Sequence, residues 1–157
     1  MSTPLPPAEF ADLDGLPPGE RDRVALFRLL VVVGSDLRTR MDRTLASAGV
    51  TTQQAALLTI VLGLAAPPSF GEAAEALGCT HQNVKQIALA LERKGLLRIE
   101  VDAGDGRVRR LVPTARAREP FADRDDSDRA TVVSWFAMLS DAEVAATLAS
   151  LWKVRGG

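Results

Sequence analysis

The 157-residue chain contains a single cysteine, a single histidine and no tyrosine. Because Cys79 stands alone, no disulfide can form within the chain, and a reducing compartment is its natural setting. Because His81 stands alone, there is no second imidazole to complete a metal site or a catalytic set. These scarcities argue against a metalloprotein and against an enzyme, and we expect the chain to need no cofactor.

Long apolar segments are also missing. The run from Leu29 to Val33, like every other apolar run in the chain, is far too short to span a bilayer. Acidic residues precede Arg21, the first basic residue, and no apolar segment follows Met1, which is unlike a secretion signal. We therefore expect a cytoplasmic protein with no membrane contact. Its hydrophobic content of 46% is enough to build the core of one domain.

The net charge of −1 is small, but the charges are unevenly placed. Acidic residues gather before Arg21 and in residues 119–128. Between residues 78 and 118, only four acids, Glu92, Glu100, Asp102 and Asp105, accompany nine bases: Lys85, Arg93, Lys94, Arg98, Arg107, Arg109, Arg110, Arg116 and Arg118. Such a local basic region attracts phosphates, although a charged cluster is also compatible with a plain solvated surface.

The first half of the chain carries two helical patterns separated by a glycine. In residues 20–48, apolar side chains recur at three- and four-residue steps, which predicts a long amphipathic helix that Gly49 closes. Thr51 and Gln54 have the spacing of a capping box. They predict a second helix through Leu64.

Residues 70–94 have the pattern of a helix-turn-helix. Ser69 and Glu72 form a capping box for a short helix that ends at Gly78. Thr80 can cap the next helix, which would be the recognition helix. The inward stripe of that helix is predicted to consist of Val84, Ile87, Ala88 and Leu91.

Residues 96–113 change from helical to strand periodicity and predict a β-hairpin, called here the wing. The first strand alternates clearly, and turn-forming residues follow at 102–106. The return strand, from Arg107 to Val112, alternates poorly. We expect its arginines to be exposed and the strand to contain an irregularity or a bulge.

The predicted fold is mainly α with a small β-hairpin: a winged helix-turn-helix plus dimerisation helices from both chain ends. Residues 1–19 hold five of the nine prolines, a composition typical of a flexible tail. Residues 20–157 are predicted to form a single domain. Its end helices, at 20–48 and 127–154, have more apolar positions than a small domain can cover, which predicts a homodimer.

This order of elements resembles the MarR family of winged-helix transcriptional regulators. The resemblance extends to four stretches: the junction at residues 49–54, the end of the recognition helix at 91–97, the wing signature Asp105-Gly106-Arg107 with Thr114, and the start of the last helix at 139–143. Pro113, Ala117 and the acidic segment at 119–128 depart from the family pattern. The resemblance implies a homodimeric, sequence-specific DNA-binding regulator, a ligand-responsive repressor.

The outward face of the recognition helix is the first candidate surface for contact with double-stranded DNA. A glutamine can pair bidentately with adenine, and a lysine can donate to guanine or to phosphate. The candidates are Thr80, His81, Gln82, Lys85 and Gln86, with the two glutamines and the lysine chosen as base contacts. The alternative is an ordinary solvated helix face.

The wing is the second candidate surface. The resemblance implies that Arg107 reaches into a minor groove, with Asp105 orienting its side chain. Arg109 and Arg110 would then neutralise phosphates and add affinity without sequence information. The alternative is an exposed loop with solvated arginines.

The residues also offer material for three other functions: catalysis, oxidant sensing and protein binding. Cys79 and His81 are the best material for catalysis, but near neighbours at a helix start seldom form a nucleophile and base pair. Because Cys79 lies near a helix N-terminus, it is also compatible with an oxidant sensor. The alternative is that Cys79 is a small buried residue in the turn of the helix-turn-helix. The alternative to DNA binding is a winged-helix module that binds another protein.

The resemblance also implies a small effector, often anionic or aromatic, bound between the dimer helices and the DNA-binding lobe. The sequence does not locate its pocket. Because tyrosine is absent, few polar side chains are candidates for it: Arg38, Arg40 and His81.

Overall fold

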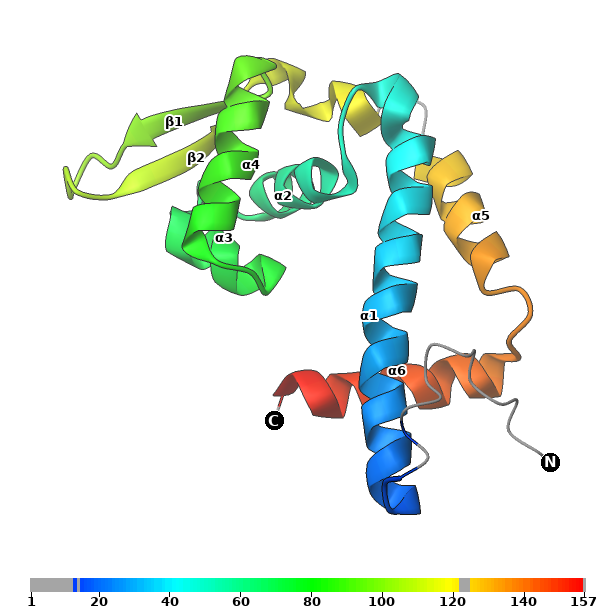
Figure 1. Ribbon diagram of the computed structural model, residues 1–157. Helices are drawn as coiled ribbons and strands as arrows, with labels where there is room; N and C mark the ends of the chain where they lie inside the picture. The colour runs from blue at the N-terminus through cyan, green and yellow to red at the C-terminus, as the bar shows by residue number, and fades with distance from the viewer. Residues whose placement is uncertain (1–12, 14, 122–124, 157) are drawn as a thin grey trace.

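The computed structural model describes residues 13, 15–121 and 125–156. Figure 1 shows a compact lobe formed by α2, α3, α4 and the hairpin, and an extended part formed by α1, α5 and α6. The predicted fold class, mainly helical with one antiparallel hairpin, is confirmed. In chain order the elements are α1 (Pro18–Thr44), η2 (Leu45–Ala48), α2 (Thr52–Gly63), α3 (Phe70–Leu77), α4 (His81–Arg93), β1 (Leu97–Val101), β2 (Arg109–Pro113), η3 (Ala115–Phe121), α5 (Asp125–Trp135) and α6 (Asp141–Gly156).

The long first helix starts and ends slightly differently from its prediction. It begins at Pro18, a residue type favoured in the first helical turn, and so starts within the predicted tail. Residues 1–12 and 14 of that tail lie outside the described residues. α1 ends at Thr44, and the chain continues to residue 48 as the tighter 3-10 turn η2. Gly49 then adopts a φ of 68°, the left-handed conformation that ends a helix as predicted.

Capping boxes define the starts of α2 and α3 as predicted. The Thr51 hydroxyl accepts the Gln54 N–H at 3.3 Å, and the Gln54 side chain accepts the Thr51 N–H at 3.2 Å. Ser69 and Glu72 make the same reciprocal pair of bonds at 3.2 and 2.6 Å. Each box satisfies two backbone N–H groups that the first helical turn would otherwise leave without partners.

The hydrophobic core lies inside the lobe. Leu57 and Leu58 of α2, Leu91 of α4, Leu97 of β1 and Leu111 of β2 are almost completely buried. Among the described residues of α1 and α6, none is buried. The lobe therefore has a core of its own, on which the recognition helix and the hairpin are mounted.

The hairpin is regular, and the predicted bulge is wrong. β1 and β2 pair one to one over five positions, from Leu97 opposite Pro113 to Val101 opposite Arg109. β2 begins at Arg109, two residues later than predicted, so Arg107 belongs to the connecting loop. The loop accounts for the poor alternation that suggested a bulge.

In the described part of the chain, the end helices expose large apolar side chains. In α1 these are Leu26, Phe27, Leu29, Leu30, Val31, Val32 and Val33; in α5, Val133; and in α6, Leu148, Leu151, Trp152 and Val154. No described helix is by itself long and apolar enough to cross a membrane, and residues 18–48 and 52–63 pass that test only together, as a pair bent by 73°.

Candidate nucleic-acid interface

The recognition helix α4 has one face in the core and one in solvent. The predicted inward stripe is buried, and it consists of Val84, Ile87, Ala88 and Leu91. On the opposite face His81, Gln82, Lys85 and Gln86 are exposed. Gln82, Lys85 and Gln86 can approach another molecule without disturbing the packing of α4.

The first turn of α4 is fixed by two contacts. The Thr80 hydroxyl accepts the Asn83 N–H at 3.2 Å, so the Thr80 side chain acts as the helix cap. The ring of His81 lies against that of Phe70 in α3, with centroids 5.3 Å apart and planes tilted by 60°. The start of the recognition helix is thereby held to the start of the preceding helix.

A shared open groove brings four of the eight predicted contact residues together. It has a volume of about 620 Å³ and runs between α4 and the wing. Four predicted residues line it: His81, Lys85, Arg107 and Arg109. Gln82 and Gln86 are exposed but do not line it. The sequence did not indicate that Ser69, Phe70 and Gly71, at the start of α3, also line the groove.

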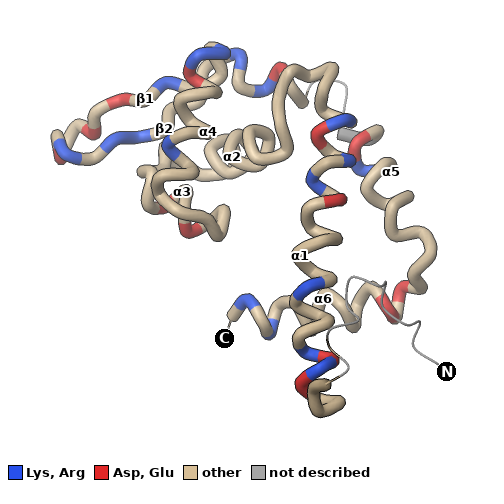
Figure 2. Tube along the Cα trace, in the orientation of Figure 1, with Lys and Arg blue, Asp and Glu red and all other residues tan. Residues whose placement is uncertain are grey.

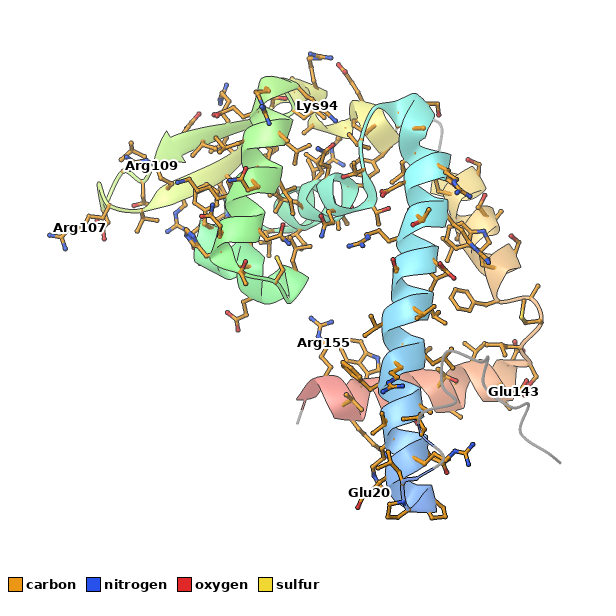
Figure 3. The ribbon with its side chains drawn as sticks, viewed as in Figure 1. Glu20, Lys94, Arg107, Arg109, Glu143 and Arg155 are labelled. Atoms are coloured by element: carbon orange, nitrogen blue, oxygen red, sulfur yellow. The ribbon has the colours of Figure 1, made fainter. Side chains whose placement is uncertain are left out.

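The wing loop presents its arginines on an ordered backbone. Asp102 Oδ1 accepts the Gly104 N–H at 2.8 Å and the Asp105 N–H at 3.0 Å, which closes the turn. Asp105 in turn accepts the backbone N–H of Arg107 at 2.9 Å. The predicted role of Asp105 is thus corrected: the contact it makes orders the backbone of Arg107 and not its side chain. Figure 3 shows Arg107 at the tip of the hairpin, extending away from the rest of the molecule.

Arg109 and Arg110 are neighbours in β2 with different surroundings. The Arg109 guanidinium donates to the carbonyl oxygens of Gly106 and Val108, at 2.9 and 3.5 Å, and the residue is exposed. The Arg110 side chain is only 33% exposed, which contradicts its predicted exposure. The reason is a set of ion pairs with Asp102 and Glu72 that the sequence pattern did not reveal.

The electrostatics of Arg110 confirm that it is tightly paired. Its hydrogen bond to Asp102 is the main cause that lowers the pKa of that carboxyl, and the N–H groups of the wing loop lower it further. The same bond raises the pKa of Arg110. The pKa of Glu72 is lowered first by the Ser69 backbone N–H and then by the Ser69 hydroxyl, with Arg110 adding to the effect. All three groups are therefore charged at neutral pH.

The groove and the wing form one basic surface. Figure 2 shows lysines and arginines along β2, at the tip of the wing and near the end of α4. Among the described residues, no carboxylate forms an ion pair with Lys85, Arg107 or Arg109. The groove has cations on both walls, Lys85 on α4 and Arg107 and Arg109 on the wing, with amide side chains beside it. Such a groove can bind a polyanion and can also donate and accept hydrogen bonds.

Sequence comparison finds a family match within the lobe. Residues 48–108, which include α2, α3, α4, β1 and the wing loop, match the MarR family. The resemblance predicted from the sequence is confirmed. A comparison with curated protein sequences finds no match.

Solved structures share the fold of the chain over most of its length. The MepR–DNA complex of S. aureus is 22% identical, with a TM-score of 0.71, and the match covers 82% of this chain and 94% of MepR. CouR of Rhodococcus jostii RHA1, bound to p-coumaroyl-CoA, is 20% identical, with a TM-score of 0.68 and coverages of 80% and 88%. The organohalide-sensing regulator RdhR, in its 2,4-dichlorophenol-bound form, is 18% identical, with a TM-score of 0.78 and coverages of 91% and 86%.

Proposed function

Because the chain carries a MarR-family region that contains the recognition helix and the wing loop, we propose that it is a sequence-specific DNA-binding transcriptional regulator. The observation that carries the proposal is the groove shared by α4 and the wing, where Lys85, Arg107 and Arg109 have no carboxylate partner among the described residues. Similarity to MepR, solved as a complex with DNA, supports it. In this proposal the DNA-binding part consists of a helix-turn-helix at residues 70–94 and a wing at residues 96–113.

The exposed face of α4 reads base edges in this proposal. When its apolar stripe faces the core, an outward helix face can enter a major groove, about 12 Å wide. Gln82 and Gln86 have the donor and acceptor pattern that adenine requires, and Lys85 can donate to guanine or phosphate. Thr80 and His81, at the positive end of the helix, lie near the phosphate backbone.

The wing adds a second contact. Arg107, at the hairpin tip, enters the adjacent minor groove, whose negative potential attracts a guanidinium. Arg109, exposed in β2, binds phosphate. Readout by α4 and electrostatic attachment by the wing would together give both specificity and affinity.

The exposed apolar side chains of the end helices favour a homodimer. Between Leu26 and Val33, α1 exposes seven large apolar side chains and interrupts them with one charged residue, Arg28. Contiguous exposed apolar surface of this kind marks a site of contact with another protein. A second copy of the chain, packed through residues 20–48 and 127–154, supplies that contact. Two recognition helices about 34 Å apart would fit a pseudo-palindromic operator.

We further propose that this regulator is a repressor that responds to a small ligand. CouR and RdhR were solved with small molecules bound, which supports an effector for this chain as well. A cavity of about 670 Å³ between the α2–α3 linker and the end of α6 is a candidate site, with Arg155 at one edge and apolar residues 64–68 along another. An effector there would change the spacing of the reading heads, because it touches both the lobe and an end helix.

Selection from a library of random DNA duplexes at several salt concentrations tests the proposal. We expect enrichment of a pseudo-palindrome and a dimer by light scattering. Gln82→Ala and Arg107→Ala should both weaken binding to the selected duplex. Gln53→Ala and Arg118→Ala are matched controls, because these side chains are exposed on other elements, outside the proposed DNA and dimer contacts. Absence of both enrichment and salt-dependent binding would contradict DNA reading and favour a protein-binding module.

A further inference from the structure

We propose that Arg110 is a positioning residue, which clamps the wing to the start of α3 instead of contacting phosphate. The inference rests on the proposed function, because it concerns how the wing is aimed at DNA. It replaces the role in phosphate binding that the sequence predicted for this arginine.

The Arg110 guanidinium contacts the wing loop with one of its nitrogens and the start of α3 with another. Arg110 Nε donates to Asp102 Oδ2 at 2.6 Å, and Nη1 donates to Glu72 Oε2 at 2.9 Å and to the Pro67 carbonyl oxygen at 3.4 Å. The Asp102 side chain is 23% exposed and the Arg110 side chain 33%, so the ion pair between them is partly shielded from water. Charge-assisted bonds of this kind fix geometry as well as proximity.

Both acidic partners already organise backbone. Asp102 closes the wing loop through the N–H groups of Gly104 and Asp105. Glu72 caps α3 by accepting the Ser69 N–H. Arg110 therefore joins Asp102, which shapes the wing loop, to Glu72, which caps the start of α3. The same end of α3 contacts the recognition helix, because the Phe70 ring lies against that of His81.

The backbone at the same place continues the connection. The Leu111 N–H donates to the Pro68 carbonyl oxygen at 2.8 Å, and Ser69 forms an isolated antiparallel bridge with Arg110. The middle of β2 is thus held to the α2–α3 linker, whereas the tip of the wing extends away from the rest of the molecule. The orientation of the wing relative to α4 is set at this point.

Charge argues against a phosphate at Arg110. The guanidinium faces two carboxylates, so the cluster of Arg110, Asp102 and Glu72 carries a net charge of −1. An approaching phosphate would meet net repulsion and would have to displace bonds already formed. Arg109, by contrast, donates only to carbonyl oxygens within the wing loop.

The variant Asp102→Asn distinguishes the two roles by the sign of its effect. Asparagine keeps a carbonyl oxygen for the wing-loop N–H groups but can no longer accept from Arg110 Nε. If Arg110 positions the wing, binding to the selected duplex should weaken about 10-fold, a loss comparable to that of one base contact. If Arg110 binds phosphate, removal of the neighbouring negative charge should leave binding unchanged or strengthen it, and the inference would be wrong.

Variants of Arg110 give a second, independent readout. A lysine cannot bind both carboxylates with one ammonium in this geometry, so Arg110→Lys should weaken binding as much as Arg110→Met. Neither should change the slope of log Kd against log salt. Arg109→Met, the control for a phosphate contact, should reduce that slope by about 1.8, which is about 0.9 for each of the two Arg109 side chains of the proposed dimer. A lysine variant equal to wild type, or a similar loss of slope in Arg110→Met, would overturn the inference.

Hydrogen exchange in the DNA-free protein separates this inference from the proposed function. Backbone exchange over residues 102–108 should accelerate in Arg110→Met and Asp102→Asn but not in Arg107→Met. If the wild type binds no duplex, the proposed function fails, and exchange alone decides whether the clamp exists. Unchanged exchange in both clamp variants would refute the clamp even if DNA binding is confirmed.

Discussion

Asp42 of α1 and Thr52 of α2 are joined by two short hydrogen bonds. The Asp42 carboxylate accepts the Thr52 backbone N–H at 2.6 Å and the Thr52 hydroxyl at 2.7 Å through the same oxygen. The Arg38 carbonyl oxygen lies 3.3 Å from the same hydroxyl. These bonds tie the last part of the long helix α1 to the start of α2 in the lobe.

Replacement of Asp42 by asparagine should lower stability in a pH-dependent way. The Thr52 N–H and hydroxyl bonds, in that order, are the main causes that lower the pKa of Asp42 below its ordinary value of 3.8. A carboxyl whose folded-state pKa is depressed stabilises the fold above its unfolded pKa, and this stability is lost as pH falls through the folded value. We expect a loss of about 1 kcal/mol at pH 7.

Urea unfolding of wild type and Asp42→Asn at equal protein concentration measures this difference across pH. The difference should be constant from pH 7 to about pH 5 and shrink below pH 4, where the wild-type carboxyl becomes protonated. A difference that does not vary between pH 7 and pH 3 would contradict the role assigned to the Asp42 charge.

Lys94 should stabilise the junction between α4 and the start of α2. Its ammonium donates to the Gly49 carbonyl oxygen at 2.6 Å and to Gln54 Oε1 at 2.7 Å. Lys94→Met should reduce the free energy of unfolding by about 0.2–1 kcal/mol, the range for exposed charged contacts. Arg93→Met is the control, because Arg93 is also exposed and adjacent. Equal unfolding midpoints for the two variants would show that the Lys94 contacts add nothing.

Thr80 should act mainly as a helix cap. Thr80→Ala removes the acceptor of the Asn83 N–H and should cost about 1 kcal/mol of stability. Thr80→Ser keeps that acceptor and should be close to wild type in both urea unfolding and DNA affinity. If Thr80→Ala weakens DNA binding without changing the unfolding midpoint, the side chain contacts DNA directly and the capping account of its role is wrong.

A charge placed on α1 should break the proposed dimer. The Phe27 side chain is 67% exposed in the single chain but would be covered by a second copy. A buried unpaired glutamate costs several kcal/mol, so Phe27→Glu should raise the dimer dissociation constant at least about 100-fold. Light scattering at micromolar concentration checks this against Gln53→Glu, which adds the same charge on an exposed position of α2. A dimer that survives Phe27→Glu would place the interface elsewhere.

Local patterns in the sequence were enough to predict most of the lobe. Helix starts followed from side chains that bond a backbone group three residues away, as Thr51 and Ser69 do. The left-handed glycines at positions 49, 78 and 95 marked where helices end. The recognition helix and its outward face were predicted correctly, because the same helical spacing of apolar residues indicates both the helix and the face that it buries.

The errors arose where distant residues decide the structure. The true start of β2 depends on the loop that Asp102 closes, and periodicity does not register a loop of that kind. Arg110 looked like an exposed strand arginine because Glu72, which it binds, is 38 residues away in the chain. The groove between α4 and the wing likewise depends on how three elements pack, which no local pattern contains.

Affinity for the selected duplex, compared with a scrambled duplex of equal length and composition at one physiological salt concentration, tests the central claim most directly. Specific regulators bind their sites at least about 1,000-fold more tightly than other DNA. We predict a ratio of that order, reduced when half a helical turn of DNA is inserted between the two half-sites. A ratio close to one, with the same affinity for every spacing, would contradict the account of this chain as a dimeric, sequence-reading protein.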